Sequence, residues 1–192
     1  MIPLPSLIQE LAPLHEALDA APAEARVHWS RSLSMGELKA LWRLAQAADA
    51  PLSVDEMVGD EGVVVTHVGK NSLPVFCNFE KRLVRAPAGI QGYNHNPGWL
   101  TRLIGPGHFT VRQESDTVVL FDYIQLAEDV PSDFPPLAPN VGGLPELVYG
   151  HMLDRVRRVS AHATIGRAWK KGKAQPAWFM LVRDDGAVDA AG

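Results

Sequence analysis

The apolar residues of the first fifty positions recur at helical spacing. Ser6 and Gln9 form a capping-box pattern. The apolar residues that follow share one helical stripe: Leu7, Ile8, Leu11, Leu14 and Leu18. Pro13 lies inside this stretch and is expected to kink or divide the helix. We therefore predict that residues 1–50 form a helical segment.

A second helix is predicted over residues 34–49. Ser34 and Glu37 repeat the capping-box pattern. Apolar residues then follow at spacings of three and four: Leu38, Leu41, Trp42 and Ala45. Because such a stripe must be buried against another element, we expect this helix to cover the end or side of a sheet.

After Pro51 the period becomes that of strands. The stretch "GVVVTHV" is rich in β-branched residues. The next one, "LPVFCNFEKRLVRA", alternates Val75, Cys77, Phe79 and Leu83 with Asn78, Glu80 and Arg82. The stretches "HFTVRQ" and "TVVLFDYIQL" are separated by "ESD", which predicts a hairpin.

The C-terminal third continues this pattern. The stretch "VYGHMLDRVRRVS" fits a helix or a strand, and the β-branched Val156 and Val159 favour a strand for its second part. The stretches "ATIGRAW" and "AWFMLV" flank a turn at "KKGKAQP". Six or more antiparallel strands with short turns predict a closed or nearly closed barrel over residues 51–186. Residues 187–192 are expected to form a flexible tail.

Two long connections interrupt the strands. They read "APAGIQGYNHNPGWLTRLIGPG" and "AEDVPSDFPPLAPNVGGLPE", and both are rich in Pro, Gly and Asn while carrying large apolar residues. Long ordered loops of this kind are usually lids or rims of sites. We predict that they border a ligand site.

The stretch Gly69-Lys70-Asn71-Ser72 has the look of a phosphate-binding loop. A Walker loop needs an earlier glycine where Val64 stands, and a hydroxyl residue where Asn71 stands. The sequence that follows predicts a strand and not the required helix. We therefore interpret these four residues as a turn between strands.

Composition limits the function classes. A length of 192 residues suits one domain with an appended helical segment. The single cysteine, Cys77, leaves no internal disulfide, which suggests a reducing compartment. The N-terminus has no secretion-signal pattern, and no apolar run is long enough to span a bilayer. The net charge of −4 argues against general nucleic-acid binding. Without a secretion signal or an apolar span, a cytoplasmic protein is expected.

The seven histidines are scattered and show no tight ligand spacing. We therefore predict no metal site and no cofactor. A barrel could still bring His67, His108 and His151 together from separate strands, and one of them could act as an acid or base. Most are expected to be hydrogen-bonded residues at the surface or rim.

The polar residues within the strands are candidates for a ligand site. Asp122 lies among apolar neighbours beside Tyr123, so its carboxylate should be paired with Arg82 or Arg112, or have a raised pKa. The Glu80 and Arg82 face could point inward as a polar anchor or outward to solvent. The predicted ligand-binding residues, with catalytic residues unknown, are Asp122, Tyr123, Arg82, Glu80, Trp99 and His108.

The C-terminal stretch "DRVRRVSAHATIGRAWKKGKAQPAWFMLVR" resembles the closing strands of lipocalin-like, or calycin, barrels. It is similar to the bacterial GXWXG family of uncertain function, with Asp154, Arg157, Arg158, Val159 and Gly166 at matching positions. The resemblance implies an antiparallel barrel with a helical lead-in. Proteins with such barrels mostly bind small molecules or lipids, and a minority are isomerases, cyclases or haem binders.

Three functions remain open. The leading hypothesis is a protein that binds a small hydrophobic or lipid-like molecule inside the barrel. The alternative is an isomerase- or cyclase-type enzyme that uses a buried carboxylate or a histidine as acid or base. A third is a structural or interaction protein with a filled barrel. The sequence leaves the oligomeric state undetermined.

Overall fold

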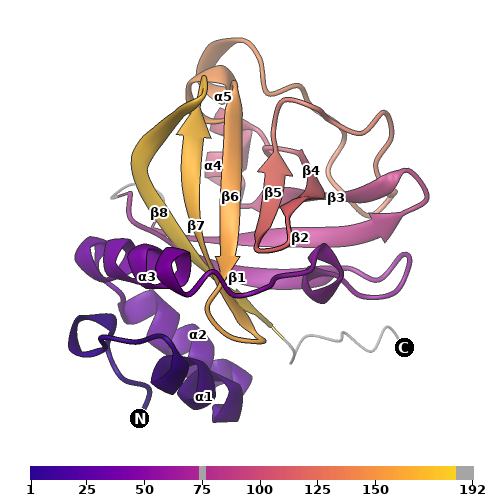
Figure 1. The fold of residues 1–192 in the computed structure, drawn as a ribbon. Coiled ribbons are helices and arrows are strands. Elements are labelled where there is room, and N and C mark those ends of the chain that lie inside the picture. Colours follow the sequence, from indigo (N-terminus) through magenta and orange to yellow (C-terminus); the bar gives the residue numbers. More distant parts are fainter. Residues whose placement is uncertain (74–76, 185–192) are drawn as a thin grey trace.

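The structure is a computed structural model that describes residues 1–73 and 77–184, so the expected tail at 187–192 lies outside the described residues. Eight antiparallel strands follow one another around a closed barrel, in which β8 pairs with β1 (Figure 1). They are β1 (Val65–Asn71), β2 (Asn78–Ala86), β3 (Gly89–His95), β4 (Phe109–Ser115), β5 (Val118–Asp122), β6 (Met152–Arg158), β7 (Ala163–Lys170) and β8 (Lys173–Arg183). The predicted barrel is confirmed.

Helices lie on one side of the barrel and at one of its ends. The N-terminal helices pack on the outside near β7 and β8, whereas two short helices lie by the end where β7 finishes (Figure 1). The helices are α1 (Ala12–Ala20), α2 (Ala23–Ser32), α3 (Met35–Ala48), α4 (Gly98–Ile104) and α5 (Gly143–Val148), with 3₁₀ turns η1 (Pro5–Leu7) and η2 (Val54–Met57). The division at residue 50 stays a prediction.

The helix α3 begins as the sequence predicts. The Ser34 hydroxyl accepts a hydrogen bond from the Glu37 backbone N–H at 3.3 Å, and the Glu37 carboxylate accepts one from the Ser34 N–H at 2.7 Å. Leu38, Leu41 and Trp42 are buried between α3 and the barrel wall. These residues share one core with the outward side chains of β7 and β8: Ala163, Ile165, Trp178, Met180 and Val182.

The first predicted helix is wrong in its details. Ser6 lies in the 3₁₀ turn η1, and α1 starts only at Ala12. Pro13 occupies the first turn of α1, where a missing backbone N–H leaves no helical bond unmade. The proline therefore starts a helix instead of kinking one.

The interpretation of Gly69–Ser72 as a turn is also wrong. The strand β1 runs through Gly69, Lys70 and Asn71, and Gly69 pairs with Phe79 on β2 and Leu181 on β8. A Cβ atom at Gly69 would lie 2.5 Å from the Phe79 ring. The glycine is thus required by the close approach of an aromatic ring and not by a turn.

The first of the two predicted long loops contains regular structure. It includes β3, which forms a hairpin with β2 around Gly89 at a φ of 120°, followed by α4. In the second, α5 forms only near its end. Glycine and proline mark the turns between these short elements, and their density concealed the elements themselves.

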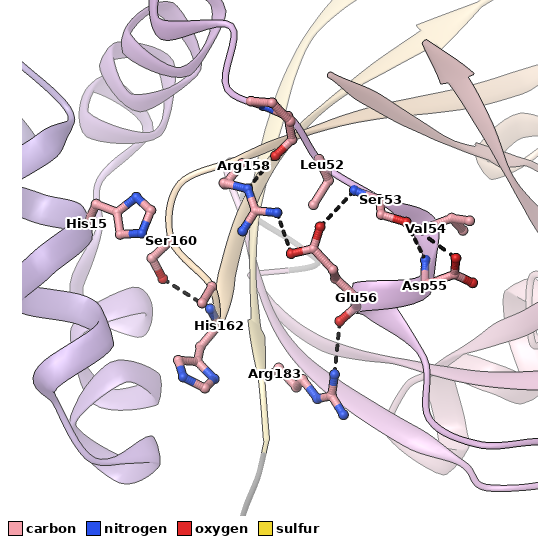
Figure 2. Close-up of polar contacts among 12 residues, drawn as sticks. His15, Leu52, Ser53, Val54, Asp55, Glu56, Arg158, Ser160, His162 and Arg183 are labelled. Atoms are coloured by element: carbon pink, nitrogen blue, oxygen red, sulfur yellow. Dashed lines mark hydrogen bonds and ion pairs between the residues drawn. The ribbon is translucent and has the colours of Figure 1, made fainter. Parts of the chain in front are cut away.

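One end of the barrel is filled and closed. Leu83, Phe121 and Val156 point into its interior and are fully buried. The turn η2 lies over this end and begins with a second capping box, formed by Ser53 and Glu56 (Figure 2). Figure 2 also shows the Arg158 guanidinium on the Glu56 carboxylate and the Arg183 guanidinium on the Glu56 backbone oxygen. These contacts join η2 to β6 and β8.

Candidate ligand-binding site

A cavity of about 380 Å³ occupies the opposite half of the barrel. Its walls come from the last residues of β1, β3 and β7 and the first residues of β2, β6 and β8, together with the helix residues Ile104, Leu147 and Val148. Most of its wall side chains are apolar: Leu73, Phe79, Ile104, Leu147, Val148, Met152, Ala168, Pro176, Ala177 and Phe179. Asn94, Asn96 and Ile104 belong to the first of the two long connections, whereas Leu147 and Val148 follow the end of the second. The role of the two connections as the rim of a ligand site stays a prediction.

The side chain of Lys81 lies at the inner end of this cavity. Strand alternation places Phe79, Lys81 and Leu83 on the inward face of β2, and the lysine side chain is only 2% exposed. Its Nζ atom donates hydrogen bonds to Asn94 Oδ1 at 3.0 Å and to the Tyr123 hydroxyl. The same atom lies 3.4 Å from Asp154 Oδ2. The three protons of the ammonium thus have three acceptors.

Aromatic rings surround the Lys81 ammonium. Its Nζ atom lies 4.7 Å from the centroid of the Phe109 ring and 5.0 Å from that of the Tyr123 ring. Three further rings lie within 5.6 Å: Phe79, Phe121 and Phe179. The ring faces attract the cation, but they replace water with an apolar medium.

Burial shifts the pKa values of both partners in this ion pair. Removal from water lowers the pKa of Lys81, and the opposite charge of Asp154 offsets only part of that effect. Burial likewise raises the pKa of Asp154 against the influence of Lys81. Both shifts favour the uncharged forms, which is the direction of proton transfer from the amine to the carboxylate.

Two tyrosines extend the polar cluster towards the barrel end. The rings of Tyr123 and Tyr149 are stacked, with centroids 5.5 Å apart and an interplanar angle of 6°. Asn94 Nδ2 donates to the Tyr123 hydroxyl at 3.2 Å, and Asn96 Nδ2 donates to the Tyr149 hydroxyl at 3.5 Å. Burial raises the pKa of both tyrosines. Both hydroxyls are therefore protonated at neutral pH and are able to donate a hydrogen bond.

Among the predicted ligand-binding residues, Tyr123 lines the cavity. Asp122, its neighbour on β5, points away from the barrel interior and caps a turn. Its Oδ1 atom accepts hydrogen bonds from the Ile124 and Gln125 backbone N–H groups at 2.8 and 3.0 Å. Its Oδ2 atom lies 3.7 Å from Arg112 Nη2, which is the arginine pairing that the sequence suggested.

The other four candidates lie apart from Lys81. Glu80 and Arg82 form an ion pair at 3.2 Å, and Glu80 borders a second hollow beside the cavity. Trp99 is 65% exposed on α4. His108 is buried, with its Nε2 atom 3.2 Å from the Pro136 backbone oxygen. A role for these residues in binding stays a prediction.

Sequence reasoning missed Lys81, although the signal was present. Two positions on either side of it stand Phe79 and Leu83, and an alternating strand places all three on one face. Asp154 entered only as a matching position of the family resemblance. The same alternation links it to Val156 on the inward face of β6. A charged residue on the apolar face of each of two strands is the pattern that predicts a buried pair.

The chain was compared with known protein families, with curated proteins and with solved structures, and none of the three comparisons found a match. The resemblance to the GXWXG family is therefore not confirmed. Within residues 1–73 and 77–184, no group of three or more His, Cys, Asp or Glu side chains is arranged to hold a metal ion. The same residues include no helix with the length and hydropathy of a membrane span.

Proposed function

We propose that the protein binds a small, mainly apolar molecule in the barrel cavity, with one polar group of the ligand directed at Lys81. The observation that carries this proposal is the combination of mainly apolar walls with a hydrogen-bonded polar cluster around Lys81 at the inner end. Such a combination is the usual form of a small-molecule site. The volume of about 380 Å³ also falls within the range of such sites, roughly 300–1,000 Å³.

The charges at the inner end favour a neutral polar group. Lys81 and Asp154 neutralise each other, so a carboxylate on the ligand would add an uncompensated negative charge to an apolar site. A carbonyl or hydroxyl group brings no charge and accepts hydrogen bonds from the tyrosine hydroxyls and the Asn96 amide. A ketone, aldehyde or alcohol with an apolar body is the ligand class that this arrangement suits.

The architecture supports the same proposal. A barrel of eight strands is just wide enough to hold one small ligand, as in lipocalins. We therefore include a lipocalin-like mode of binding in the proposal, with the ligand in the barrel and the α4 and α5 helices at its mouth.

The proposal is tested by filling the cavity. Ala177 lines the cavity on β8, whereas Ala174 on the same strand is exposed and lies outside it. The wild-type protein should bind a hydrophobic fluorescent probe, Ala177→Trp should lose most of that binding, and Ala174→Trp should retain it. Equal binding by all three proteins, or no binding by the wild type, would reject the cavity as a ligand site.

A second candidate function is acid–base catalysis in the same cavity. A buried carboxylate, Asp154, lies beside the Tyr123 hydroxyl, so one group could accept a proton while the other hydrogen-bonds a carbonyl oxygen. Such a pair would exchange a hydrogen next to the carbonyl. Deuterium exchange into a bound ketone, followed by NMR, should then be lost in Asp154→Asn. Exchange at the same rate in this variant would exclude that role.

A further inference from the structure

We propose that Lys81 forms an imine with an aldehyde or ketone group of the bound molecule. This inference rests on the proposed function, because it requires a ligand in the cavity, and it names the class of that ligand. The geometry that carries it is a lysine amine at the inner end of a mainly apolar cavity, with a carboxyl and a phenol beside the same atom.

The surroundings of Lys81 suit a nucleophilic amine. Five aromatic rings lie within 5.6 Å of Nζ and keep water from it. An amine in such a desolvated pocket is activated because its protonated form loses hydration. Asp154 lies 3.4 Å from Nζ and is able to take the ammonium proton. The result is a neutral amine beside a neutral carboxylic acid.

The reaction is balanced within the cluster. The neutral Nζ attacks the carbonyl carbon, a C–N bond forms, and a proton moves from nitrogen to the former carbonyl oxygen. Asp154 then gives its proton to that hydroxyl group, and the C–O bond breaks to release water. The nitrogen lone pair forms the C=N bond, so a protonated imine faces the Asp154 carboxylate. The ion pair and one carbonyl thus become an iminium–carboxylate pair and one water molecule.

The cavity contains a second lysine, which provides an internal comparison. Lys170 lies at the rim, and its Nζ atom donates to the backbone oxygens of Glu146 and Leu147 at 3.1 and 2.7 Å. Its side chain is partly open to solvent, and no carboxylate is among these partners. Its amine is thus partly open to solvent and bound to two backbone oxygens, whereas that of Lys81 is surrounded by aromatic rings beside a carboxylate. The two lysines should therefore differ in reactivity.

Reductive trapping with a matched pair of probes tests the inference. The protein is incubated at about pH 6, where ordinary lysines are almost fully protonated, with octanal and sodium cyanoborohydride. We expect one octyl group, located on Lys81 by peptide mass spectrometry, and no adduct in Lys81→Met. The exposed Lys173→Met variant should be labelled like the wild type. An excess of 1-octanol, which fits the same site but cannot form an imine, should slow the labelling.

Non-covalent binding separates this inference from the proposed function. Displacement of a fluorescent probe by both octanal and 1-octanol, without an adduct on Lys81, would overturn the imine and leave the binding function in place. Failure of both to displace the probe, with no adduct, would count against both. Labelling of Lys170 or of surface lysines at the same rate as Lys81 would also overturn the imine. Retained probe binding by Lys81→Met would show that its lack of an adduct is not a loss of folding.

Discussion

At the scale of single residues, Lys81 carries its charged group inside the barrel, where the side chain is only 2% exposed. Its ammonium is removed from water, and one carboxylate, one amide oxygen and one phenol oxygen replace the lost hydration. A buried pair of this kind adds little net stability, because desolvation of both ions offsets their attraction. Removal of only one partner lowers the stability strongly, because it leaves the other charge buried and unpaired. Because of this difference, the interaction energy of the pair can be measured by comparing single and double variants.

Asp154→Asn should lower the free energy of unfolding by about 3–5 kcal/mol, because Lys81 is left without its counter-ion. The double variant Lys81→Met with Asp154→Leu should lose much less, since it removes both charges and keeps the apolar volume. Urea unfolding of the wild type, of Asp154→Asn, and of the cycle formed by Lys81→Met, Asp154→Leu and their double variant provides the measurement. Losses that simply add in the double variant would show that the two side chains do not interact.

His108 gives a prediction about pH. Burial lowers the pKa of His108, and hydrogen bonds with the Pro136 and Pro135 backbone oxygens offset this only in part. The unfolded chain, with a histidine pKa of about 6.5, therefore binds more protons below that pH than the folded chain does. The free energy of unfolding should fall as the pH drops below about 6.5 and should not depend on this group above it.

The control for that prediction is His108→Gln, which retains a donor for Pro136 but has no titratable ring. Unfolding measured between about pH 7.5 and about pH 5.5 should show a steeper decline in the wild type than in the variant. The lowered pKa values of Asp49 and Glu56 act at lower pH and do not interfere. Parallel declines would assign the pH dependence to other groups.

The residues of the site differ in how far the sequence reveals them. Tyr123 was predicted as the neighbour of Asp122 in an apolar strand, and it lines the cavity. Asp122 was conspicuous as a carboxylate among apolar residues, but its side chain points away from the barrel interior. The face of a strand depends on its register, which a sequence shows only through alternation. Lys81 was missed because lysines are almost always exposed, and composition alone gives no reason to place one inside.

At the scale of elements, local signals were predicted better than long-range ones. The capping box of α3 involves residues only three positions apart, so the sequence contains the whole motif. The course of β1 through Gly69, in contrast, depends on a contact with a residue ten positions further along the chain. The Phe79 ring, which needs the space above Gly69, makes this contact. No periodicity in residues 62–72 could have indicated that ring.

The packing of α3 on the barrel leads to a prediction of stability. Trp42 is 6% exposed and lies against Trp169, with ring centroids 5.7 Å apart. Trp42→Ala should cost about 3–5 kcal/mol, because it leaves a cavity between helix and strands. Met35 on the same helix is 59% exposed, so Met35→Ala should change stability by less than about 0.5 kcal/mol. A loss below about 1 kcal/mol for Trp42→Ala would mean that α3 is only loosely attached.

At the scale of the whole molecule, the two barrel ends have different roles. The end under η2 is filled by side chains, whereas the other end contains the cavity. Two arginines bind η2 to β6 and β8 at the filled end (Figure 2). Under the proposed function, the ligand would enter at the cavity end, where Ile104 of α4 and Leu147 and Val148 of α5 line the cavity. The short helix α5 is fixed by Lys170, whose ammonium binds the backbone oxygens of Glu146 and Leu147. This contact connects the covering helix to the barrel wall.

Loss of that connection should affect exchange of the ligand more than its affinity. Lys170→Met retains the length of the side chain but cannot bind the α5 carbonyl oxygens. We expect the hydrophobic probe to associate and dissociate faster in this variant than in the wild type, with a smaller change in its dissociation constant. Stopped-flow fluorescence measures both rates. Unchanged rates would indicate that the ligand does not pass α5.

The strand β8 contacts two apolar cores, one on each of its faces. Trp178, Met180 and Val182 face the N-terminal helices, while Phe179 and Leu181 face the interior. In most sheets a slip of one residue exposes apolar groups to water and is rejected for that reason. In β8 a slip of one residue would exchange the apolar side chains of one face for those of the other. Polarity therefore hardly distinguishes the correct register from the shifted one. Shape must distinguish them instead: the Phe179 ring lies directly against Gly166, where a Cβ atom would have no space. The correct register of β8 is thus selected by the fit of the Phe179 ring into the space above Gly166.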